Sequence, residues 1–200
     1  MLLNGEQPAA APTAAPSRWL QRWIHLLPPG ASVLDVACGS GRNLRWLAAQ
    51  GFALTGVDRD EAALGPLRSL AEIVIADLEA GPWPFPGRRF DLVLVTHYLW
   101  RPLLPTLVDT VARGGFLIYE TFAQGQETIG RPSRSDFLLR HGELLAACRD
   151  LHVVAYENGF VPGPPPRYLQ RIVAAREPAP LPRHRLPEAP SAAGAAEPEG

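Results

Sequence analysis

The segment VLDVACGSGRN, residues 33–43, places one acidic residue and two glycines where an apolar run breaks into a short polar loop. Asp35 lies inside the apolar run, where an isolated charge is costly unless it has partners, such as loop amides or a cationic amino group. Gly39 and Gly41 allow the backbone to approach a ligand closely and leave the first amides of the next helix free to donate hydrogen bonds. The segment therefore predicts a site for a nucleoside-bearing cofactor.

Other polar residues end the apolar runs that follow. Asp58 ends ALTGVD, residues 53–58, and Asp77 ends IVIAD, residues 73–77. A carboxylate after the second strand can accept both hydroxyls of a ribose. Asp77, together with the amide of Leu78, can read an adenine edge.

A third cluster, Thr96, His97 and Tyr98, ends FDLVLVTHY at residues 90–98. The carboxyl ends of parallel strands meet at one edge of a doubly wound sheet, where ligands bind at the switch in strand order. We therefore expect all these residues to converge there.

The elements that position these residues follow from hydrophobic periodicity and from the glycines and prolines between the runs. Strands alternate with helices through the fifth strand, which predicts an α/β sandwich with a parallel sheet, and the last two strands are expected to form an antiparallel hairpin. Strands are expected at 33–38, 53–58, 73–77, 90–98, 115–122, 152–159 and 167–175, and helices at 17–27, 41–50, 60–70, 105–113 and 142–148.

Composition limits the possible functions. The chain has 200 residues and a formal net charge of −1, which indicates one main domain and gives no electrostatic reason to expect nucleic-acid binding. All 19 basic residues are arginine, so reactions that need a lysine amine are excluded.

The two cysteines are far apart and signal neither a disulfide framework nor a zinc site, and no metal is expected. No apolar run is long enough to span a membrane, so a cytoplasmic protein is expected. Residues 17–176 are expected to form the domain, with disordered tails at 1–16 and 177–200.

The quoted segments, together with WPFPGRRFDLVLV and GGFLIYETF, resemble in order and spacing the class I S-adenosylmethionine-dependent methyltransferases, over nearly all of residues 18–176. Among these, the chain looks like small, stand-alone bacterial members, including those similar to tellurite-resistance methyltransferases. The resemblance implies a three-layer Rossmann-like sandwich with a seven-stranded, mostly parallel sheet, S-adenosyl-L-methionine as the cofactor, and methyl transfer to a small molecule.

The resemblance also implies residue roles. Asp35, Gly39 and Gly41 fall around the methionine part, Asp58 at the ribose, Asp77 and Leu78 at the adenine, and Thr96 near the cofactor's centre. The predicted cofactor-binding set also includes neighbours of these positions: Ala37, Cys38, Arg42, Asn43 and Arg59. The family loop is usually DxGxGxG, and Ala37 replaces its first glycine. Because alanine disfavours positive φ, we expect ordinary backbone at Ala37.

Three residues are candidates for the chemical step. His97 could act as a general base, because its titration lies near working pH. Tyr98 could border the sulfonium through its ring face. Glu120, near the end of the fifth strand, could steer a cationic or hydroxylated substrate.

Alternatives remain at this point. A nicotinamide-dependent dehydrogenase would need a third glycine where Leu44 stands. An aminopropyltransferase could share the fold, and a non-catalytic module could use the cofactor as a sensor. The acceptor cannot be read from the fold, because residues of different loops select it.

Overall fold

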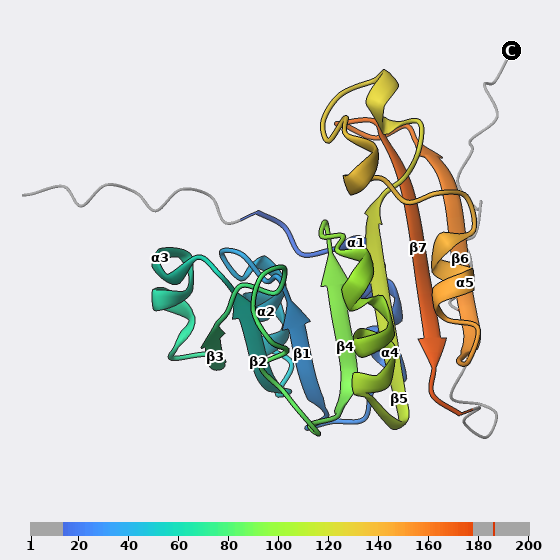
Figure 1. The fold of residues 1–200 in the computed structure, drawn as a ribbon. Coiled ribbons are helices and arrows are strands. Elements are labelled where there is room, and N and C mark those ends of the chain that lie inside the picture. Colours follow the sequence, from blue (N-terminus) through green and yellow to red (C-terminus); the bar gives the residue numbers. More distant parts are fainter. Residues whose placement is uncertain (1–13, 178–185, 187–200) are drawn as a thin grey trace, which may run out of the picture.

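The computed structural model describes residues 14–177 and residue 186 (Figure 1). The predicted tails therefore lie outside the described residues, apart from residues 14–16, 177 and 186. The strands are β1 (Ser32–Val36), β2 (Ala53–Asp58), β3 (Glu72–Ile75), β4 (Phe90–Thr96), β5 (Val111–Phe122), β6 (His152–Val161) and β7 (Arg167–Ala175). The α-helices are α1 (Arg18–Trp23), α2 (Arg42–Ala48), α3 (Glu61–Leu64), α4 (Leu104–Thr110) and α5 (Glu143–Ala147).

The seven strands form one sheet in the order β3-β2-β1-β4-β5-β7-β6. The pairs from β3 to β5 are parallel, and β7 runs antiparallel to both β5 and β6. This arrangement confirms the predicted parallel sheet and the C-terminal antiparallel pair. The strand order reverses between β1 and β4, so the carboxyl ends of these two strands flank the position where open α/β sheets bind ligands.

Each face of the sheet carries its own hydrophobic core, which gives the three layers. Alternation along β1 directs Leu34 and Val36 into one core and Val33 into the other, as expected for a strand covered on both faces. The first core is closed by α4 and α5, and the second by α1, α2 and α3 (Figure 1).

The N-terminal helix is fixed to the sheet by polar contacts as well as by burial. Ser17 caps α1 as predicted, because its side chain accepts a hydrogen bond from the Leu20 amide. The Trp19 indole donates to the Ile172 carbonyl of β7, at 3.2 Å, and Arg22 pairs with Glu157 of β6, at 2.8 Å. The start of the described chain is thus attached to the C-terminal hairpin, far away in the sequence.

Gly41, directly before α2, is a position where the fold favours glycine for two reasons. Its φ is +75°, and a Cβ atom at this position would lie 2.4 Å from Cδ1 of Leu67. Both the left-handed backbone and the packing of the loop against this buried leucine therefore exclude a side chain.

We predict that Gly41→Ala lowers the free energy of unfolding by about 2–4 kcal/mol, because left-handed strain and overpacking add. Gly30→Ala is the matched control, since Gly30 has the same φ of +75° and a Cβ atom there would meet nothing within 4 Å. The control should lose only about 1–2 kcal/mol. Urea unfolding of the two variants measures the difference, and equal losses would show that the Leu67 contact does not matter.

Candidate active site

The loop between β1 and α2 has left-handed backbone at three alternate residues. The φ angles are +52° at Ala37, +53° at Gly39 and +75° at Gly41. Our prediction of ordinary backbone at Ala37 is wrong. The loop is held in this turn by the hydrogen bond that the Cys38 amide donates to the Val57 carbonyl of β2. Alanine can adopt this conformation at a cost of about 1 kcal/mol, which the surrounding contacts offset.

Asp58, at the end of β2, holds this loop in place. One carboxylate oxygen accepts the Gly39 amide at 2.8 Å, and the other accepts the Asp60 amide at 3.0 Å. Each carboxylate oxygen has two lone pairs, so the half-exposed side chain keeps acceptor capacity on its open side. Asp58 is therefore able to bind hydroxyl groups while it supports the loop.

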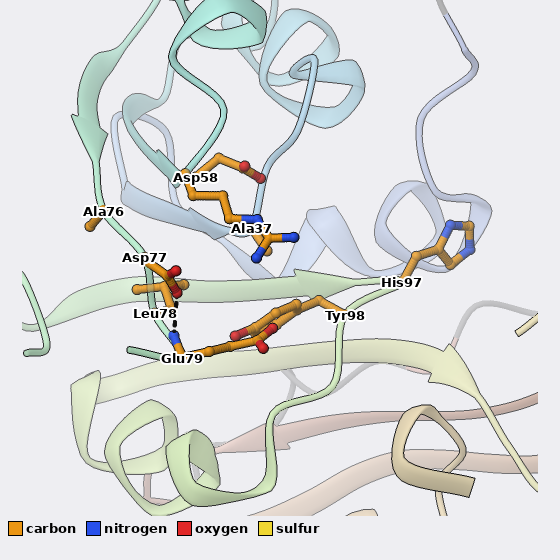
Figure 2. Close-up of a pocket in the computed structure, with 9 residues that line it drawn as sticks. Ala37, Asp58, Ala76, Asp77, Leu78, Glu79, His97 and Tyr98 are labelled. Carbon is orange, nitrogen blue, oxygen red and sulfur yellow. Dashed lines mark hydrogen bonds between the residues drawn. The ribbon is translucent and has the colours of Figure 1, made fainter. Parts of the chain in front are cut away.

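Asp77 follows β3 and organises the next turn. Its Oδ1 accepts the amides of Glu79, at 2.9 Å, and Ala80, at 3.2 Å. These two hydrogen bonds, the Glu79 one first, lower the pKa of Asp77 below its usual value, so the side chain is ionised at neutral pH. Figure 2 shows Asp77, Leu78 and Glu79 along one side of the pocket.

Asp35 lies below the loop in the central strand, next to Gly56 of β2 and Leu94 of β4 in register. The residue is 1% exposed, and neither carboxylate oxygen has a hydrogen-bond partner among the described residues. Burial raises the pKa of Asp35 to about 7, although the nearby Arg42 guanidinium and Asn43 amide oppose this shift. The loop amides thus do not satisfy the carboxylate, and a cationic partner remains the better candidate.

Cys38 is buried beside Asp35. Burial raises the pKa of its thiol far above the usual value, and the negative charges of Asp35 and Asp58 add to this effect. A thiol that stays protonated is not a nucleophile. The structure therefore agrees with a packing role for Cys38.

His97 stands at the end of β4 in left-handed backbone, with φ at +58°, and its amide donates to the Glu120 carbonyl at 2.9 Å. A guanidinium nitrogen of Arg42 lies 3.4 Å from Nδ1 of His97. Because arginine can only donate, Nδ1 accepts and the ring proton is on Nε2. Burial first, and then Arg42, lowers the pKa of His97 below its usual value, so the ring is neutral at pH 7.

Asn43 and Thr96 are buried behind His97. The Asn43 amide donates to the Thr96 hydroxyl at 3.0 Å, and its oxygen accepts the Ser17 amide at 3.0 Å. These contacts connect α2, β4 and the cap of α1. Both residues support the site from below, and neither lines a cavity at this edge of the sheet.

Glu120 does not reach a cavity either. It is 5% exposed, its Oε2 lies 3.1 Å from Nη1 of Arg171, and its Oε1 accepts the Ser17 hydroxyl at 2.8 Å. Two partners already engage this carboxylate. Its position therefore gives no support to the predicted contact with substrate.

Two adjoining cavities open at this edge of the sheet. The first measures about 290 Å³ and the second about 330 Å³. Glu79, His97 and Tyr98 line both, so the cavities meet at these residues, just beyond the end of β4. Figure 2 shows the residues of the first cavity. The first is lined further by Ala37, Asp58, Arg59, Ala76, Asp77 and Leu78, and the second by Leu99, Thr121, Phe122, Pro132 and Phe137.

Sequence reasoning missed several of these residues. Ala76 and Glu79 flank the predicted Asp77 and Leu78, so extending that turn by one residue each way would have found them. Pro132 and Phe137 lie far beyond the end of β5 in a segment without periodicity, and no spacing pattern points to them. Arg131 and Arg134, which flank Pro132, line neither cavity, and Arg134 pairs with Asp136 at 2.9 Å.

Residues 33–114 match the model of a methyltransferase domain. They run from β1 to the start of β5 and include every residue that lines the first cavity. Residues 33–114 are thus a methyltransferase domain, and the described chain has the class I, Rossmann-like fold of S-adenosylmethionine-dependent methyltransferases. Of the residues that line only the second cavity, four lie beyond the matched segment: Thr121, Phe122, Pro132 and Phe137.

Several solved methyltransferase structures share the fold of this chain. TehB from Haemophilus influenzae is 19% identical with a TM-score of 0.61, and the alignment covers 76% of this chain and 59% of that one. A methyltransferase from Methanosarcina mazei is 14% identical with a TM-score of 0.64, over 82% of this chain and 99% of that one. Magnesium protoporphyrin IX methyltransferase from Synechocystis, solved with bound SAH, is 19% identical with a TM-score of 0.59, over 80% and 79%.

These likenesses concern the fold. A search of the curated proteins finds no significant match. The chain spans 59% of the length of the TehB chain that it matches. Within the part of the chain that the structure describes, no helix is long and apolar enough to cross a membrane, and no group of three or more His, Cys, Asp or Glu could hold a metal ion.

The pKa of Asp35 predicts how stability depends on pH. Its pKa is about 7 in the folded protein and about 3.8 when the chain is unfolded, so the folded state holds the extra proton between these values. The stabilisation from this proton is complete below pH 3.8 and is lost as pH rises to 7, by about 4 kcal/mol at most. Asp35→Asn should remove this loss.

The measurement is the free energy of unfolding at pH 5 and pH 8 for the native protein and the variant. Asp150→Asn is the control, because its side chain is 79% exposed. The difference between the two pH values should shrink in Asp35→Asn and stay unchanged in the control. An unchanged difference in both variants would mean that Asp35 is ionised in the folded protein throughout this range.

Proposed function

We propose that this methyltransferase transfers a methyl group from S-adenosylmethionine, held in the first cavity, to a small molecule held in the second. The observation that carries the proposal is the junction of the two cavities at His97 and Tyr98. A donor in one cavity and an acceptor in the other would face each other at these residues.

The charges of the first cavity fit this cofactor. Asp58, Asp77 and Glu79 line it against a single cation, Arg59. S-adenosylmethionine carries a sulfonium and an ammonium against one carboxylate, so its net charge is opposite to that of the cavity. A nicotinamide dinucleotide would bring a pyrophosphate next to these carboxylates, which argues against the dehydrogenase alternative.

We assign Asp58 to the ribose hydroxyls and Asp77 with Leu78 to the adenine. The loop of Ala37 and Gly39 would lie along the methionine part, because its left-handed turns expose the backbone there. Asp35 lies under the same loop, and its carboxylate has no hydrogen-bond partner among the described residues. If the loop moved aside, an ammonium group of the ligand would supply that partner. Cys38, Arg42, Asn43 and Thr96 would support this site from behind or beside it.

When bound, S-adenosylmethionine supplies a methyl group on a positively charged sulfur. The protein's main contribution is alignment, and correct orientation of two reactants can remove about 7–11 kcal/mol from a barrier. His97 is neutral and has its proton on Nε2, so in this arrangement it orients the acceptor as a hydrogen-bond donor rather than acting as a base. The ring of Tyr98 borders both cavities and excludes water from their junction.

The ribose assignment predicts that Asp58→Asn weakens binding of S-adenosylmethionine about tenfold or more, because hydrogen bonds to a charged group contribute about 1.5–3 kcal/mol. Isothermal titration calorimetry measures the affinity. Asp60→Asn is the control, because Asp60 is the N-cap residue of α3, two residues after Asp58, and does not line the cavity. Equal affinity of the Asp58 variant and the native protein would contradict the assignment.

A further inference from the structure

The second cavity is lined by aromatic rings from three separate parts of the chain. His97 and Tyr98 come from the end of β4, Phe122 from the end of β5, and Phe137 from the segment that follows β5. The rings of His97 and Phe122 are stacked, with centroids 5.1 Å apart and an interplanar angle of 29°. Leu99 and Pro132 complete an otherwise apolar wall.

These rings are held at the cavity and are only partly used in core packing. Phe137 is 42% exposed and Phe122 is half-buried. The Tyr119 hydroxyl donates to the Tyr98 carbonyl at 2.8 Å, which fixes the backbone that carries the Tyr98 ring. Apolar surface that lines a hollow and remains open to solvent marks a binding site rather than a core.

The polar groups of this cavity are few. Thr121 and Glu79 line it together with the His97 ring, and no arginine is among its lining residues. Arg42 and Arg167 lie close enough to His97 to lower its pKa, but neither lines the cavity. The Arg134 guanidinium lies over the Phe137 ring, 5.3 Å from its centroid, but it does not line the cavity either. A hydrated oxyanion inside the cavity would therefore lose its water mostly against ring carbons.

We infer that the methyl acceptor is a small aromatic compound that carries a hydroxyl, thiol or amino group. Its ring lies among Tyr98, Phe122 and Phe137, and its nucleophilic atom points to the junction with the first cavity. Aromatic pairs prefer offset-stacked or edge-to-face contacts, which rings on three sides can provide. The inference rests on the proposed function, because it assigns the second cavity to the acceptor.

The transfer balances without another reactant. A bond forms between the acceptor's oxygen, sulfur or nitrogen and the methyl carbon, and the methyl–sulfur bond breaks with its electron pair left on sulfur. The acceptor loses one proton, which passes to solvent at the side of the cavity where Glu79 is exposed. The products are the methylated aromatic compound and S-adenosylhomocysteine.

The experiment compares an aromatic probe, 4-methylphenol, with its saturated counterpart of similar size, 4-methylcyclohexanol; the phenylalanine variants below separate ring contacts from the stronger hydrogen-bond donation of the phenol. Ligand-observed NMR titration measures their binding to protein saturated with S-adenosylhomocysteine, so the readout does not depend on turnover. We expect 4-methylphenol to bind about fivefold more tightly or better, since each ring contact favours the aromatic probe.

Two variants locate this preference. Phe137→Leu and Phe122→Leu each replace a ring by an apolar side chain, and each should reduce the preference to about twofold or less. Ile129→Leu is the control, because Ile129 is 43% exposed in the segment after β5 but does not line the cavity. It should retain the full preference.

Equal binding of the two probes, or a preference that survives in both phenylalanine variants, would overturn the inference. A turnover assay gives a second test, with selenite as an oxyanion acceptor. If S-adenosylhomocysteine forms from S-adenosylmethionine with selenite but not with 4-methylphenol or 4-methylthiophenol, the inference is also overturned. Failure of the native protein to bind S-adenosylmethionine would instead overturn the proposed function. Cofactor binding without a ring preference would overturn the aromatic acceptor alone.

Discussion

The hydrogen bond from the Gly39 amide to the Asp58 carboxylate joins the ends of the two strands that begin the site. Parallel pairing of β1 with β2 brings these ends side by side, and the amide of Cys38 continues the contact to Val57. Between these contacts the loop turns through left-handed backbone at Ala37, Gly39 and Gly41. The shape of the first cavity and the orientation of Asp58 both depend on this turn, because the Gly39 amide that belongs to the turn also holds the Asp58 carboxylate.

Four carboxylates near this edge of the sheet illustrate how surroundings decide the role of a residue type. Asp58 and Asp77 accept backbone amides and stay open to the first cavity. Glu120 is occupied by Arg171 and Ser17, and Asp35 has no hydrogen-bond partner in the described part of the chain. Similar side chains thus provide two carboxylates that line the first cavity, one structural ion pair and one buried acid with a raised pKa.

The N-terminal helix takes part in the site although it lines neither cavity. Ser17 contacts Asn43 through its amide and Glu120 through its hydroxyl, and Asn43 contacts Thr96. The backbone of His97 is fixed by Glu120, so the cap of α1 and the junction of the two cavities share the same supports. A substitution in α1 should therefore shift the position of His97, because the buried polar groups between them have few arrangements in which all are hydrogen-bonded.

Much of the fold could be predicted because its signals are local. Alternating strand and helix periodicity, with glycines and prolines between the runs, located the strands within a few residues. Asp58 and Asp77, which the sequence singles out, both line the first cavity. The prediction for Ala37 failed because a propensity describes the average residue, whereas the loop around this alanine is held by the hydrogen bond from the next residue, Cys38, to Val57 of β2. The prediction for Glu120 placed it near the right strand end, but the partner that engages it, Arg171, lies on a strand that is remote in sequence.

The sequence by itself determined the α/β class, the parallel edge where the strand ends meet, and the carboxylates at that edge, since each depends on periodicity or on residues close together in the chain. Only the tertiary structure decided which side chains face a cavity and which are satisfied internally. It also brought Phe122 and Phe137 next to His97, because packing of a segment without periodicity depends on long-range contacts that no local pattern encodes.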